Sequence, residues 1–99
     1  MSESTNYLAL GEHTAYTAQA RDAARRRHSA LYAAAILLDK ASSEPERPLR
    51  SFCVGDLLDI ACAADREMCA AIKRANQAAA LCGKAPITVR ATAAASQLD

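Results

Sequence analysis

The sequence predicts an all-α protein: a long antiparallel helical hairpin over about residues 12–41 and 52–82, followed by a short C-terminal helix. Three observations lead to this prediction. Apolar residues recur three and four positions apart through both ranges, which is the period of a helix buried along one side. The 99 residues include only 3 glycines and 3 prolines, so few positions interrupt a helix. Two of the prolines fall in the segment between the ranges, where a helix cannot continue.

Composition indicates one small domain with an alanine-rich core. Hydrophobic residues make up 52% of the chain, but aromatic residues only 4%. Alanine buries little area, and a core built from it gains stability from close helix approach and from oligomerisation. We expect a single helical domain over residues 1–99, with a disordered start at 1–6, an interhelical loop at 42–50 and a tail at 84–99.

The first helix, predicted over about 12–41, is amphipathic. The polar residues 4–6 are of the types that cap a first turn, and Gly11 either separates that turn from the helix or weakens a continuous helix. Asp22 and Arg26 stand four apart, in the order that favours a weak exposed ion pair. The predicted apolar track consists of Tyr16, Ala20, Ala24, Leu31, Ala35 and Leu38, with Ala23 and Ala34 beside it.

The second helix, predicted over about 52–82, has Ser51 as its expected N-cap and Gly83 as its stop. Its seam, the line of residues that faces the first helix, is predicted to be Val54, Leu58, Ala61, Asp65, Met68, Ile72, Ala75, Ala79 and Cys82. In the tail, the spacing of Ile87, Ala91, Ala94 and Leu98 fits a short third helix, whereas residues 87–89 alone would suit a strand. We favour the helix.

A charged residue within an apolar seam requires a partner. If the hairpin folds so that facing residue numbers sum to about 92 or 93, Arg27 and His28 fall opposite Asp65. We interpret these three residues as a structural polar layer that fixes the register of the two helices, as a buried asparagine does in coiled coils. The alternative is a buried His–Asp couple acting as a general-base dyad or a pH sensor.

The second helix is apolar beyond its seam. Leu57, Ile60, Ala64 and Ala71 widen one flank, and Cys62 and Cys69 widen the other. The apolar arc covers roughly 200° of the helix, about twice the width that one neighbouring helix covers. We therefore expect a homodimer that resembles a four-helix bundle.

A second stripe on the first helix consists of Arg21, Arg25, Tyr32 and Ile36. Arginine and tyrosine beside an aliphatic residue are enriched at protein interfaces, so the stripe is a candidate partner-binding surface. In the alternative interpretation, Tyr32 and Ile36 contact the dimer mate or the tail.

The four cysteines lie at positions 53, 62, 69 and 82. No two of them have the C-x-x-C spacing, so the signature of a structural zinc site is absent. We expect them to be reduced thiols packed in the core, and we expect no metal and no cofactor. No motif for a phosphate-binding loop, a zinc protease or a serine hydrolase occurs, which argues against an enzyme.

Charge and hydropathy narrow the remaining classes of function. The net charge of +1 lacks the basic excess typical of nucleic-acid binders, and no apolar run approaches the roughly 18 residues that span a bilayer. We expect a cytoplasmic, non-enzymatic module that binds another protein as an adaptor, regulator or inhibitor, of the kind that phages and mobile elements use to block host machinery. The alternative is a small nucleic-acid-associated regulator that uses the basic patch at Arg21–His28.

Overall fold

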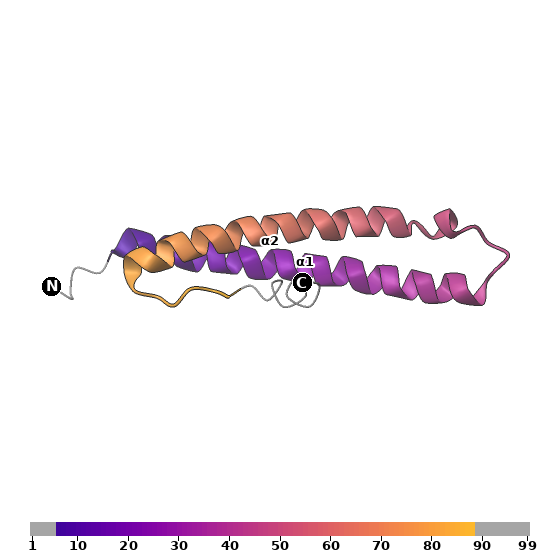
Figure 1. Ribbon diagram of the computed structural model, residues 1–99, viewed down its shortest axis with the longest axis horizontal. Helices are drawn as coiled ribbons and strands as arrows, with labels where there is room; N and C mark the ends of the chain where they lie inside the picture. Colours follow the sequence, from indigo (N-terminus) through magenta and orange to yellow (C-terminus); the bar gives the residue numbers. More distant parts are fainter. Residues whose placement is uncertain (1–5, 89–99) are drawn as a thin grey trace, which may run out of the picture.

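The computed structural model describes residues 6–88, which form an antiparallel hairpin of two long helices (Figure 1). Helix α1 spans Tyr7–Ser43 and helix α2 spans Val54–Cys82. The short 3-10 helix η1, Leu49–Phe52, lies in the turn between them. Within residues 6–88 every regular element is helical, so the predicted helical hairpin is confirmed.

Helix α1 begins about five residues before the predicted start. The Asn6 side chain caps it by accepting a hydrogen bond from the Ala9 N–H at 3.0 Å. Gly11 lies inside the helix, where a glycine costs about 1 kcal/mol relative to alanine. The cap and the burial of Ala9 favour a helix on the N-terminal side of Gly11, so Gly11 weakens a continuous helix and does not break it.

The N-cap prediction for α2 is wrong, because Ser51 lies inside η1. Cys53 precedes α2 instead, with a left-handed φ of 55° and no side-chain capping bond. This backbone geometry accompanies the burial of Phe52, the residue before Cys53. The Phe52 side chain packs with Ala34 and Val54 in a cluster of buried residues. Burial of Phe52 therefore takes precedence over a serine cap.

Alanine fills the interface between α1 and α2. Eleven of the thirteen buried residues within 6–88 are alanines, the others being Phe52 and Val54. Along α1 one series of buried and half-buried positions advances in alternating steps of four and three: Ala9, His13, Tyr16, Ala20, Ala23, Arg27, Ala30, Ala34, Leu37 and Ala41. The alanines of this series are small and let the two backbones approach closely.

The predicted seams are therefore only partly correct. On α2, Ala64, Ala71 and Ala78 are buried, whereas the predicted seam residue Leu58 is 44% exposed. On α1, Leu31 is 45% exposed, and Ala35 and Leu38 of the predicted track are also exposed. For Leu31, Leu38 and Leu58 the physical reason is size, since closely spaced helices leave little room for leucine, and these three lie at the edge of the interface.

After α2 the chain turns back along the hairpin. Gly83, with a left-handed φ of 78°, ends the helix as predicted, and the Lys84 N–H donates to the Ala79 carbonyl at 3.0 Å. Residues 84–88, which we call the strap, run back along the hairpin without helical structure (Figure 1). The predicted tail helix therefore does not include Ile87, and its remaining positions lie outside the described residues.

Close packing of the alanines leads to a stability prediction. Ala75 is completely buried, whereas Ala80, five residues further along the same helix, is exposed. Ala75→Leu should lower the free energy of unfolding by about 1–3 kcal/mol, because the larger side chain must push the helices apart. Ala80→Leu, the matched control, should change it by less than about 0.5 kcal/mol. Urea unfolding followed by circular dichroism measures both, and equal effects would contradict a tightly packed alanine interface.

Candidate functional site

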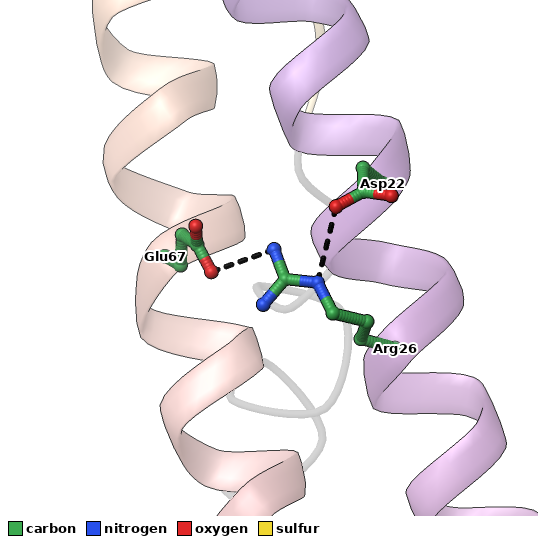
Figure 2. Close-up of polar contacts among 3 residues, drawn as sticks. All are labelled: Asp22, Arg26 and Glu67. Carbon is green, nitrogen blue, oxygen red and sulfur yellow. Dashed lines mark hydrogen bonds and ion pairs between the residues drawn. The ribbon is translucent and has the colours of Figure 1, made fainter.

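Two consecutive arginines in the middle of α1 form ion pairs with carboxylates of α2. Arg27 Nη1 donates to Asp65 Oδ1 at 2.6 Å. Arg26 Nη2 lies 2.7 Å from Glu67 Oε2, and Arg26 Nε donates to Asp22 Oδ2 at 3.1 Å (Figure 2). The facing numbers 27 and 65 sum to 92, and 26 and 67 sum to 93. The predicted helix register and the predicted Asp22–Arg26 pair are thus confirmed.

The Arg27–Asp65 pair is not buried, contrary to the expectation. Its two side chains are 36% and 49% exposed. The Cα trace is only 14 Å thick in its shortest dimension, so the hairpin is a single layer and water reaches both of its edges. At this exposure an ion pair contributes about 0–1 kcal/mol. Its role as the determinant of helix register stays a prediction.

Arg26 connects the helices through a partner that the sequence analysis missed. The hydrogen bond to Glu67 is the main cause that raises the pKa of the Arg26 guanidinium above its usual value, and the bond to Asp22 acts in the same direction. Arg26 therefore remains charged at any ordinary pH. The signal that identifies Glu67 is the register itself, which places it opposite Arg26.

His28 does not join the polar pair. It is exposed, and its ring stacks on Tyr32 one turn further along α1, with centroids 6.2 Å apart and planes inclined by 21°. One residue is a rotation of 100°, so the position after Arg27 points away from the facing helix. The predicted three-residue layer is reduced to Arg27 and Asp65, and the alternative His–Asp couple does not form.

The candidate partner-binding stripe lies on the outside of α1. Tyr32 is 63% exposed, Ile36 is 52% exposed, and Arg21 and Arg25 are also exposed. Neither Arg21 nor Arg25 forms an ion pair with another residue in the range 6–88. The basic patch is therefore divided, because the charges of its next two arginines are already paired with carboxylates.

The expectation that the cysteines pack in the core is wrong for the single chain. Cys53, Cys62 and Cys69 are exposed and Cys82 is half-buried; all four are free thiols. The alanine seam occupies the interface, so the positions beside it face outward. Among the described residues no three histidine, cysteine or acidic side chains lie close enough to hold a metal ion.

Two grooves run between the helices, one along each edge of the interface. One, of about 340 Å³, is lined by Leu31 and Leu58 from opposite helices, with Cys62 beside them and the Arg27–Asp65 pair at its end. The other, of about 530 Å³, is lined by Leu57 and Ile60 together with Arg26 and Glu67. The carboxylates in both grooves are paired with arginines, whereas the leucines and the isoleucine contact water.

A third groove holds the strap. Asn76 makes two hydrogen bonds to one residue: its Nδ2 donates to the Ile87 carbonyl at 3.0 Å, and the Ile87 N–H donates to its Oδ1 at 2.7 Å. Ile87 forms one wall of a groove of about 250 Å³ whose other lining residues come from both helices: Thr17, Ala20, Arg21, Ala24, Met68 and Ile72. No sequence pattern pairs Asn76 with Ile87, and the sequence analysis missed both roles.

Comparison of the chain with protein-family models, with curated proteins and with solved structures found no match. Neither α1 nor α2 has the combination of length and hydropathy that a membrane-crossing helix needs. The function of the chain is therefore inferred from its own residues.

The cross-helix contacts predict a specific pattern of energetic coupling. A double-mutant cycle with Arg27→Ala and Asp65→Ala should give a coupling free energy of about 0.5–1 kcal/mol that shrinks in concentrated NaCl. The cycle with His28→Ala and Asp65→Ala is the control and should give a coupling near zero, since His28 contacts Tyr32 instead. Unfolding in urea measures each free energy. Coupling of His28 to Asp65 as strong as that of Arg27 would contradict the observed geometry.

Proposed function

We propose that this chain is a non-enzymatic protein–protein interaction module that acts as an adaptor, regulator or inhibitor of a partner protein. The observation that supports the proposal is the distribution of apolar side chains, which differs from the usual one of large apolar residues inside. Small alanines make up most of the interior, whereas many of the large apolar side chains lie outside. Ten large hydrophobic residues within 6–88 are exposed: Tyr7, Leu8, Leu31, Tyr32, Ile36, Leu38, Leu49, Leu58, Ile60 and Leu81. Of these, Leu31 and Leu58 line one groove between the helices, and apolar side chains grouped on one surface are typical of interaction sites.

A second copy of the chain is the proposed occupant of the groove between Leu31 and Leu58. Leu38 lies seven residues beyond Leu31, on the same side of α1, and extends this apolar surface. Burying the exposed half of each leucine contributes about 1 kcal/mol per side chain, and a symmetric dimer buries every such residue twice. Two single-layer hairpins packed in this way form a four-helix bundle, in which the thiol of Cys62 also becomes buried.

The outer stripe of Arg21, Arg25, Tyr32 and Ile36 points away from that groove and is the proposed contact for a different protein. Tyr32 is pre-organised by its stack on His28, which lowers the entropy lost when a partner orders it. The basic residues Arg21 and Arg25 flank it and favour a partner with an acidic edge.

The nucleic-acid alternative has less support. Of the four arginines in the basic patch, Arg26 and Arg27 are paired with carboxylates of α2, which leaves Arg21 and Arg25 for phosphates. Affinity for nucleic acid rises with the number of phosphates that a protein neutralises, so two arginines provide only a weak footprint.

The proposed dimer predicts a change in mass on mutation. Sedimentation equilibrium should give twice the mass of one chain for the wild type and the mass of one chain for the Leu31→Glu/Leu58→Glu variant. Circular dichroism should show unchanged helicity, since both side chains lie at the edge of the interface. Leu8→Glu places the same charge on an exposed leucine at the other end of the hairpin and should remain dimeric. A wild type that stays monomeric at high micromolar concentration would refute the dimer.

The proposed function is tested by capture of partners on the tagged full chain from lysate of the native host, with and without nuclease. A stoichiometric protein should survive nuclease treatment and be lost with Tyr32→Ala, because that change removes the centre of the stripe. Tyr7→Ala, the same change at an exposed tyrosine near the start of α1, should leave capture unchanged. Recovery of nucleic acid, or loss of every partner after nuclease, would support the alternative function instead.

A further inference from the structure

The strap is attached to the hairpin by very few contacts. Of residues 84–88 only Ile87 is half-buried, and the rest are exposed. Its backbone N–H and C=O are both bonded to the Asn76 amide, and its side chain borders the groove between α1 and α2. Beyond Lys84, whose N–H bonds to the end of α2, the strap is therefore held at one residue, through one backbone pair and one apolar side chain.

The paired hydrogen bonds of Asn76 recognise a backbone conformation and not a residue type. An amide that donates to the C=O and accepts from the N–H of the same residue reproduces the pairing between neighbouring β-strands. Only an extended segment offers both groups, because a helix uses them internally. Pro86, directly before Ile87, restricts the backbone toward extended conformations and lowers the entropy lost on binding.

The groove is larger than its present occupant. About 250 Å³ remains beside Ile87, bounded by apolar atoms of Ala20, Ala24, Met68 and Ile72. The Thr17 hydroxyl, at the same groove, is buried and has no hydrogen-bond partner among residues 6–88. An unsatisfied buried hydroxyl is destabilising, and a ligand with a polar backbone group at this position would satisfy it.

From these contacts we infer that the Asn76 groove is a binding site for an extended peptide segment of a partner protein, one with an apolar residue directly after a proline, and that the strap is its competitor within the chain. The ligand replaces Ile87 on Asn76, fills the groove with a larger side chain and bonds to Thr17. The strap keeps the site closed in the absence of such a segment, because its covalent attachment gives it an effective concentration of about millimolar.

This site is centred on Asn76 of α2 and shares only Arg21 with the outer stripe, and its ligand is a defined chemical segment. A failure of the partner capture described above would therefore leave it untouched, and its own failure would leave the outer stripe untouched.

The test is a titration followed by NMR, with the isotope-labelled full chain and a synthetic peptide of residues 83–88 as the probe. Ile87→Ser removes the apolar anchor of the strap and leaves the groove intact. In this variant the peptide should shift the Asn76 side-chain resonances and the amides of Ala20 and Ile72 saturably. In the wild type, where the strap competes, the apparent affinity should be about tenfold weaker.

Two paired variants identify the residue responsible. Ile87→Ser/Asn76→Ala should lose saturable binding, and alanine at this position favours the helix, so α2 stays folded. Ile87→Ser/Gln77→Ala, at the exposed neighbouring residue, should bind as Ile87→Ser does. A peptide in which serine replaces the isoleucine should not bind. Absence of saturable shifts in Ile87→Ser, or equal binding with and without Asn76, would overturn the proposal.

Discussion

Close contact between the alanines of α1 and α2 is the constraint on which the rest of the structure depends. Within residues 6–88, eleven buried alanines bring the two backbones together along most of the hairpin, and little space remains between them for leucine or isoleucine. Phe52 is buried only where the chain turns from one helix to the other. Close packing of the alanines makes the hairpin slender and leaves large side chains on its outer surfaces. An interior of this kind buries little apolar area per residue.

The polar contacts follow from the same close packing. Because the helices are near each other, Arg27 reaches across to Asp65 from the middle of α1. Arg26 reaches across to Glu67 in the same way (Figure 2). Both pairs lie at the edges of the interface, where water screens them, so they contribute little to stability. Their geometry nevertheless agrees with the single register in which the alanines of the two helices meet. They also remove two positive charges from the basic segment of α1 and leave Tyr32, Ile36 and their flanking arginines as its most distinctive surface.

The apolar surfaces divide into three areas along the hairpin: the groove between Leu31 and Leu58, the outer stripe around Tyr32, and the Asn76 groove under the strap. Among residues 6–88, only the last is covered by another segment of the chain, through two hydrogen bonds and one isoleucine. A single layer of two helices has too few elements to cover its own apolar surface. The functional proposals all follow from this uncovered apolar surface. In each proposal another molecule covers part of it: a second copy of the chain, a protein partner or an extended peptide.

The sequence by itself determined the helical hairpin, the stop at Gly83 and the register that pairs Arg27 with Asp65. These follow from local periodicity, from backbone restrictions at glycine and proline, and from the need to pair charges that fall opposite each other. Tertiary structure decided which face of each helix lies inside. Along α2 the series through Leu58 and the series through Ala64 have the same helical period, and only the closeness of the helices excludes the leucine. It also decided the outward positions of His28 and the cysteines, and the attachment of Ile87 to Asn76, because contacts between distant residues leave no periodic signal in the chain.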